Sequence, residues 1–153
     1  MENIDQIDRR ILHHLQMDTT ESLEDLGQKI GLSRNACWRR IRALEEAGVI
    51  AGRVALLDAS RVDLGLSVFI QIRTKNHEAD WLHKFASATR ALPEIQGVYR
   101  MSGDLDYLVR ARVKDVPAYD RLYQKLVKSV PLADVSASFV MEEIKETTAL
   151  PIL

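Results

Sequence analysis

The sequence predicts a two-domain protein of the α+β class, and three observations support that fold class. In the first 50 residues, apolar side chains recur every three or four positions, which is the spacing of amphipathic helices. From residue 66 onward, segments of strand-like alternation are separated by two further helical stretches. Between the halves, residues 59–65 are polar enough to mark a boundary. We therefore expect one domain at residues 1–50, a strand or hairpin linker at 51–65 and a second domain at 66–153.

Three helices are predicted in the first domain. The apolar positions of the first helix are Ile4, Ile7, Ile11, Leu12 and Leu15. Ser22 precedes the second helix as its N-cap, and Gly31 ends that helix in the left-handed conformation. Ser33 caps the third helix, which stops at Gly48. The inward positions of this third helix are Cys37, Ile41 and Leu44. A support helix followed by two helices joined through a short glycine-containing turn is the helix-turn-helix arrangement.

The segment from residue 49 to 58 mixes apolar residues with Gly52 and Arg53. We expect a short strand, a turn and a second strand here, which would serve as a wing or a linker. With this hairpin, the first domain is predicted to be a winged helix-turn-helix domain.

The second domain is predicted to follow the order β-α-β-β-α-β. The helices end before Pro93 and Pro131. Apart from Phe69, the first strand alternates apolar and polar residues, and the later strands are expected at residues 95–101, 107–113 and 135–141. This order is that of the ferredoxin-like fold, in which both helices cover one face of an antiparallel sheet.

The opposite face of that sheet would expose apolar and aromatic side chains. The residues expected there are Phe69, Gln71, Tyr99 or its neighbours, and Val140. Exposed aromatics on a sheet face usually have a partner. A second copy of the same sheet, paired by two-fold symmetry, is the simplest one.

The composition is that of a globular protein and excludes several other classes. Hydrophobic residues make up 46% of the 153 residues and charged ones 28%, which argues against disorder. The longest apolar run, Val54–Leu57, is far shorter than the roughly 20 residues of a membrane span, and the acidic N-terminus does not resemble a secretory signal. The single cysteine, Cys37, and the histidines offer no disulfide and no metal-ligand spacing. The four histidines are His13, His14, His77 and His83. We expect a cytoplasmic protein without a metal or cofactor.

The charge distribution points to a nucleic-acid partner although the net charge is −1. Residues 1–25 carry two arginines against seven acidic residues, a net of −5. Residues 33–53 carry five arginines against two glutamates, a net of +3. The basic charge is therefore concentrated on the second helix of the helix-turn-helix pair.

The outward side of this helix has the residue types that read DNA. Its candidate DNA-binding residues are Arg34, Asn35, Trp38, Arg39 and Arg42. Arginine and asparagine reach guanine and adenine edges bidentately, while Arg39 and Arg42 can equally bind phosphates. Ser22 and Ser33 stand at helix N-termini, where free backbone amides suit a phosphate. Trp38 packs either near Arg53 or against a sugar. The alternative is a basic face that is merely solvated.

The stretch Ser102-Gly103-Asp104-Leu105-Asp106-Tyr107 between two strands is a candidate ligand site. It places two carboxylates two positions apart beside a glycine that lets a ligand approach backbone amides. The acids would take an ammonium group and the amides a carboxylate, as in a free amino acid. An ordinary hairpin turn explains the same residues equally well.

These motifs resemble those of the Lrp/AsnC family of bacterial and archaeal transcriptional regulators, also called feast/famine regulatory proteins. In the first domain the resemblance rests on residues 4–12 (Ile-Asp-Gln-Ile-Asp-Arg-Arg-Ile-Leu), 31–33 (Gly-Leu-Ser), 37–45 (Cys-Trp-Arg-Arg-Ile-Arg-Ala-Leu-Glu) and 48–52 (Gly-Val-Ile-Ala-Gly). In the second it rests on residues 103–108 (Gly-Asp-Leu-Asp-Tyr-Leu) and 143–148 (Glu-Ile-Lys-Glu-Thr-Thr). Their order and spacing extend over essentially the whole chain.

The resemblance implies a homodimer built through the second domain, assembled further into tetramers or octamers, that binds pseudo-palindromic promoter DNA. It implies that the second domain is an effector-binding (RAM) domain for an amino acid. Carried over by position, the effector-binding residues are Ser102, Gly103, Asp104, Asp106, Tyr107, Ser136 and Ser138. The recognition helix corresponds to residues 33–45. Many relatives have Pro, Ser or Thr where this chain has Arg34 and Asn35, so its operator preference is expected to differ.

The main hypothesis is a sequence-specific transcriptional regulator of amino-acid metabolism genes, cytoplasmic and associated with the nucleoid. An alternative is an architectural nucleoid protein that wraps DNA without an effector. A thermal-shift screen of the twenty amino acids discriminates between the two. An enzyme is not expected, because the serines of the last strand have no histidine nearby in the pattern to act as a base.

Overall fold

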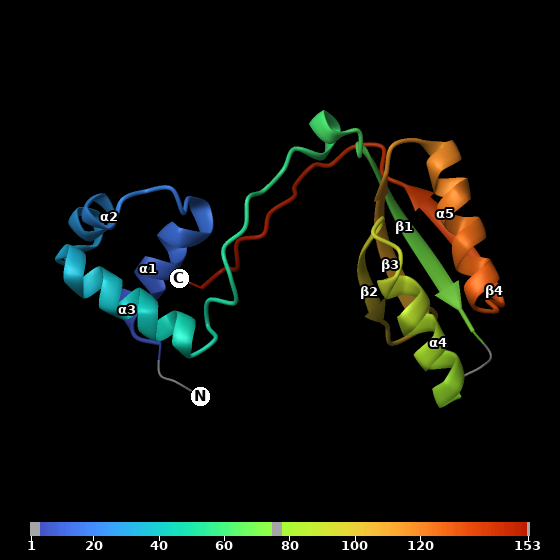
Figure 1. Ribbon diagram of the computed structural model, residues 1–153, viewed down its shortest axis with the longest axis horizontal. Coiled ribbons are helices and arrows are strands. Elements are labelled where there is room, and N and C mark those ends of the chain that lie inside the picture. Colours follow the sequence, from blue (N-terminus) through green and yellow to red (C-terminus); the bar gives the residue numbers. More distant parts are fainter. Residues whose placement is uncertain (1–3, 75–77, 153) are drawn as a thin grey trace. The chain divides into compact units, whose positions relative to one another are not determined.

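The computed structural model describes residues 4–74 and 78–152, which divide into two compact units (Figure 1). One unit comprises Met1–Ala55 together with Ile144–Leu153, and the other comprises Leu56–Glu143. The C-terminal tail, Ile144–Leu153, which was predicted as part of the second domain, groups with the helical unit in the structure. His77 lies outside the described residues.

The helical unit contains the three predicted helices, α1 (Gln6–Met17), α2 (Leu23–Ile30) and α3 (Arg34–Glu46). The Ser22 hydroxyl caps α2 and the Ser33 hydroxyl caps α3, as expected. Gly31 ends α2 with φ 78°, in the left-handed region that glycine adopts without a steric cost. The core of the unit consists of Ile11, Leu26, Ile30, Cys37, Ile41 and Leu44. The helix-turn-helix prediction and the inward side of α3 are confirmed.

The predicted hairpin at residues 49–58 is wrong. This segment contains no strand, and the only regular structure described between α3 and the sheet is a short 3₁₀ helix, Ala59–Val62. The apolar side chains that suggested strands are largely exposed: Val54 at 79%, Leu56 at 71% and Leu57 at 73%. An isolated two-stranded hairpin is at best marginally stable in water, and here no third strand or core layer supports one. The domain is therefore a helix-turn-helix domain without the wing.

The second unit has the predicted β-α-β-β-α-β order. Its elements are β1 (Leu66–Arg73), α4 (Ala79–Arg90), β2 (Ile95–Arg100), β3 (Tyr107–Val113), α5 (Val116–Ser129) and β4 (Asp134–Phe139). The strands form one antiparallel sheet in the order β2-β3-β1-β4. The last strand ends two residues earlier than predicted, at Phe139, and Met141 is 96% exposed rather than inward. The ferredoxin-like fold is otherwise confirmed.

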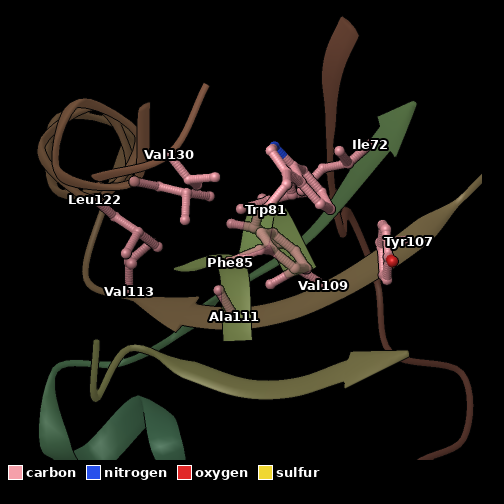
Figure 2. Packing of buried hydrophobic residues seen from close by; sticks show 12 residues of the cluster. Ile72, Trp81, Phe85, Tyr107, Val109, Ala111, Val113, Leu122 and Val130 are labelled. Atoms are coloured by element: carbon pink, nitrogen blue, oxygen red, sulfur yellow. The ribbon is translucent and has the colours of Figure 1, made fainter. Parts of the chain in front are cut away.

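The core of this unit lies between the helices and one face of the sheet (Figure 2). The ring of Phe85 stacks on Trp81 with centroids 5.1 Å apart and contacts Tyr107 at 4.9 Å. The indole N–H of Trp81 donates to the carbonyl of Pro131 at 2.8 Å, which satisfies the polar atom of a buried ring. Across residues 4–74 and 78–152, none of the helices has the length and apolar composition needed to span a membrane.

Candidate functional site

The outward side of α3 carries all five predicted DNA-contacting residues in exposed positions. The five are Arg34, Asn35, Trp38, Arg39 and Arg42. Trp38 is 56% exposed and does not pack into the core, which leaves its ring available to a ligand surface. Because Cys37, Ile41 and Leu44 are buried on the opposite side of the helix, α3 is held by its apolar stripe and presents its basic side to solvent.

The arginines of this segment differ in whether an acid of the same unit neutralises them. Arg42 approaches Glu45 at 3.4 Å and Glu46 at 3.9 Å, and Arg53 approaches Glu45 at 2.9 Å. Arg34 and Arg39 make no ion pair with any residue that the structure describes. A phosphate or base would therefore bind Arg34 and Arg39 without displacing an existing carboxylate. The net charge of residues 33–53, summed from the sequence, therefore overstates the positive charge that is free to bind DNA.

Arg40 has a different role from its neighbours on α3. Its guanidinium lies 2.8 Å from the carboxylates of both Asp5 and Asp8, at the start of α1. The pKa of the Asp5 carboxyl is lowered, chiefly by the backbone N–H of Asp8 and next by Arg40. Asp5 also forms a capping box with Asp8. Arg40 thus ties the recognition helix to its support helix, a contact that sequence analysis missed.

The two helix N-termini at the turn are not equally suited to a phosphate. The Ser22 hydroxyl accepts the N–H of Asp25 at 3.1 Å and donates to the Asp25 carboxylate at 2.7 Å. A carboxylate at this position repels an anion and already interacts with the helix dipole. The first turn of α3 contains no acid, and the Ser33 hydroxyl accepts the N–H of Ala36 at 3.3 Å. The α3 terminus is therefore the better phosphate site.

Gly27 is a structural residue of the turn that sequence analysis did not single out. It lies inside α2, is buried, and has no unusual φ. A Cβ at this position would lie 2.5 Å from the backbone oxygen of Leu32 and 3.4 Å from Sγ of Cys37. Glycine is required here because α2 and the following turn approach each other too closely for a side chain. Within the predicted helix, a glycine at an inward position was the available signal.

In the second unit, the loop with Gly103 is fastened to the end of β1. The Asp106 carboxylate accepts the N–H of Thr74 at 2.8 Å, and the Asp106 N–H donates to the carbonyl of Ile72 at 3.1 Å. Gly103 has φ 103°, a conformation that favours glycine. Asp106 therefore has a structural role, whereas Asp104 and Ser102 are exposed on the loop.

Arg73 joins this loop to the beginning of β4. Its Nε donates to the carbonyl of Asp104 at 3.0 Å, and its Nη1 lies 3.1 Å from the Asp134 carboxylate. Ser136 follows on β4 and its hydroxyl lies 3.5 Å from Oε1 of Gln71. Ser138 pairs with Phe69, farther along the sheet. The structure thus brings the loop and the start of β4 together through Arg73, a residue that sequence analysis did not name.

The ring of Tyr107 points away from this region. It is 6% exposed and lies in the core beside Trp81 and Phe85 (Figure 2). Tyr107 begins β3, and alternation from that position turns its side chain toward the helices. Tyr107 is one of the predicted effector-binding residues, and the structure places its ring in the core rather than at the surface of the loop.

Comparison with known proteins identifies both units. Residues 4–45 match the AsnC-type helix-turn-helix domain, and residues 67–150 match the Lrp/AsnC ligand binding domain. The glutamate uptake regulatory protein of Zymomonas mobilis is 50% identical over 149 residues, covering 97% of this chain and 91% of its own.

Two solved structures are similar over nearly the whole chain. An AsnC family transcriptional regulator from Agrobacterium tumefaciens is 48% identical with a TM-score of 0.93 and covers 96% of both chains. A transcriptional regulator from Neisseria meningitidis in complex with L-methionine is 33% identical with a TM-score of 0.92 and covers 97% of both. The chain belongs to the Lrp/AsnC family of transcriptional regulators, and it is a regulator rather than an enzyme.

Proposed function

We propose that this regulator reads promoter DNA with α3 and adjusts its DNA affinity to an amino acid bound by the second domain. The observation that carries the DNA part is the exposed side of α3, where Arg34 and Arg39 have no acidic partner in the described structure. Arg34 and Asn35, at the helix start, contact base edges, and Arg39 contacts the phosphate backbone. Trp38 packs against a sugar.

Substitutions on α3 test this division of roles. Arg34→Ala and Asn35→Ala should each relax sequence preference by roughly 1–3 kcal/mol, the worth of a good bidentate base contact. Arg39→Ala should weaken binding to all sequences alike and flatten its salt dependence. Arg42→Ala should have a smaller effect than Arg39→Ala, because glutamates already neutralise Arg42. Arg90→Ala, an exposed arginine of α4, is the control.

The assay is a gel shift with DNA from upstream of the protein's own gene and its neighbours, at stated salt and with competitor DNA. If Arg34→Ala and Asn35→Ala leave operator discrimination unchanged, the reading face has been misplaced. Weak, salt-sensitive and sequence-blind binding by the unmodified chain would instead favour the architectural alternative.

The proposed effector is an amino acid held near the Gly103 loop and the start of β4. The match to a ligand-binding domain, the name of the glutamate uptake regulator and the L-methionine complex support this class. Ser102, Gly103 and Asp104 contribute loop groups, and Ser136 contributes a hydroxyl from β4, with Ser138 at its far end. Asp104→Ala should abolish the effector response and leave DNA binding intact, whereas Asp120→Ala on α5 should change neither. Loss of DNA binding in Asp104→Ala would mean that the loop is structural.

We propose further that the protein is a dimer through the open face of the sheet, assembling into tetramers or octamers. Tyr99 on β2 is 46% exposed, and Phe69 on β1, two strands away in the same sheet, is half-buried. These features support a covered face. A monomeric mass at micromolar concentration in light scattering would contradict the dimer. The proposed location is the cytoplasm, at the nucleoid.

A further inference from the structure

The C-terminal tail is bound by side chains of the support helix α1. Gln16 uses both ends of its amide on one tail residue: Nε2 donates to the carbonyl of Leu150 at 3.2 Å, and Oε1 accepts the Leu150 N–H at 2.6 Å. One helical face makes these contacts, because Arg9 lies seven positions before Gln16 and its Nη1 donates to the carbonyl of Ile152 at 2.8 Å. Figure 1 shows the C-terminal segment returning to α1.

The tail is shaped for this contact by its own sequence. Pro151 restricts Leu150 to an extended conformation, which presents the N–H and carbonyl of Leu150 together. The Ile152 N–H donates to the carbonyl of Leu150 at 3.0 Å, closing a three-residue turn around Pro151. Ile152 is half-buried, while Leu150 is 67% exposed. The helix therefore recognises the main chain of the tail rather than the Leu150 side chain.

The bound helix is the one that supports the recognition helix. Ile11 of α1 is fully buried in the same core as Cys37 and Ile41 of α3. Arg40 of α3 adds a charged connection to Asp5 and Asp8 at the start of α1. The helix that holds the tail therefore contacts the recognition helix directly, through a packed core and through ion pairs.

The tail is also a direct continuation of β4. Nine residues, 140–148, separate the end of β4 from Ala149, a span of at most about 30 Å when fully extended. β4 carries Ser136 and Ser138, two of the residues proposed to meet the effector, so the effector region and the tail are consecutive parts of the chain. With the tail bound, the two units are joined by a second connection in addition to residues 47–65.

We propose that residues 149–152, the C-terminal latch, carry the effector response from the second domain to the DNA-binding unit, with Arg9 and Gln16 of α1 as the latch receptor. This inference rests on the proposed amino-acid response. The latch adds a regulatory contact to the DNA-binding unit and takes no part in reading DNA.

The test compares full-length protein with Gln16→Ala and with a chain ending at Thr148. Gln6→Ala, an exposed glutamine of the same helix that makes no hydrogen bond with residues 149–152, is the matched control. Hydrogen exchange at the Leu150 amide reports latch binding and should become roughly three- to tenfold faster in Gln16→Ala, the factor that a net hydrogen bond supports. Circular dichroism and the Tm of each variant establish that it is folded.

The regulatory readout is the Kd for DNA measured without an amino acid divided by the Kd measured with it. The amino acid used is the one of the twenty, each tested singly, that changes the Kd of the unmodified chain most. Allosteric couplings are typically about 5–150-fold. We expect this ratio to fall toward one in Gln16→Ala and in the truncated chain. The Kd without an amino acid should stay within about twofold of the value for the unmodified chain, which is a small change compared with a typical allosteric coupling. Gln6→Ala should keep the full ratio.

The other outcomes separate the latch from the proposed function. Unchanged ratios in both latch variants would overturn the latch and leave the effector function standing. Loss of DNA binding in a folded Gln16→Ala would make the latch a structural brace and also overturn its regulatory role. A full-length chain that responds to none of the twenty amino acids would overturn the effector function and the regulatory role together.

Discussion

Replacing Gly27 by alanine should destabilise the DNA-binding unit, although alanine is the better helix former. The new Cβ would lie 2.5 Å from the backbone oxygen of Leu32, and real Cβ contacts essentially never fall below 3.0 Å. The helix and the turn must therefore separate by at least the difference, 0.5 Å. The Leu32 N–H donates to the carbonyl of Gly27 at 2.8 Å, so this movement also strains the hydrogen bond that closes the turn.

Two contributions of opposite sign set the magnitude of this effect. Removing a glycine from a helix interior stabilises the folded state by about 1 kcal/mol. Forcing an extra methyl group into a packed core lowers the free energy of unfolding by about 1–3 kcal/mol. The upper end applies to Gly27, because the obstructing atom belongs to the backbone and Sγ of the buried Cys37 is only 3.4 Å away. The free energy of unfolding should therefore fall by about 2 kcal/mol.

Cys37 provides an assay that reports on this unit alone. It is the only cysteine of the chain and is fully buried in the helical core. Burial raises the pKa of its thiol, which further suppresses reaction of the folded state with a thiol reagent such as DTNB. When labelling follows the opening equilibrium, a loss of about 2 kcal/mol makes it roughly thirtyfold faster.

Gly52, in the same unit, is the matched control. A Cβ at Gly52 has nothing within 4 Å, so Gly52→Ala should not accelerate labelling. Labelling of Gly27→Ala at the wild-type rate or slower would refute the reasoning about the turn.

Two further predictions concern acid stability and the second core. Asp5→Asn keeps the helix cap but removes the titration of the carboxyl. The pKa of Asp5 in the folded state lies below 3.8, so the carboxylate stabilises the wild-type protein above about pH 4, and this stability is lost as the pH falls through the folded pKa. The free energies of unfolding of wild type and variant, measured in urea, should therefore converge in acid. A difference in the free energy of unfolding between wild type and Asp5→Asn that grows below about pH 4 would contradict the lowered pKa of Asp5. Phe85→Ala should cost about 3–5 kcal/mol through loss of the Trp81 and Tyr107 contacts. Urea unfolding followed by Trp81 fluorescence in a Trp38→Phe background measures it, and a loss below roughly 1.5 kcal/mol would mean that the site collapses around the cavity.

Much of the fold was predictable because its determinants are local. Ser22, Ser33 and Gly31 define helix ends through hydrogen bonds and backbone conformations within four residues of themselves. The strand β3 was predicted with its observed bounds, Tyr107–Val113, because alternation specifies both its length and its buried face. The exposure of the α3 residues followed from the same helical periodicity.

The errors arose where a local pattern had no tertiary partner, or had an unexpected one. Apolar residues at 54–57 suggested strands, but a strand also needs a neighbour that supplies backbone hydrogen bonds. Tyr107 was assigned to the effector through its place in a loop motif, whereas the pleat of β3 directs its ring into the core. In both cases the local pattern is present in the sequence, and the surroundings decided what its side chains do.

The sequence by itself determined the family, the order of the elements, the helix caps and the inward face of each helix and strand, because periodicity and capping act over a few residues. Only the tertiary structure decided which arginines remain unpaired, why Gly27 must be glycine, and where the tail binds. Arg40 meets Asp5 across 35 positions and Gln16 meets Leu150 across 134. Such contacts depend on how the whole chain folds back on itself, and no local pattern records them.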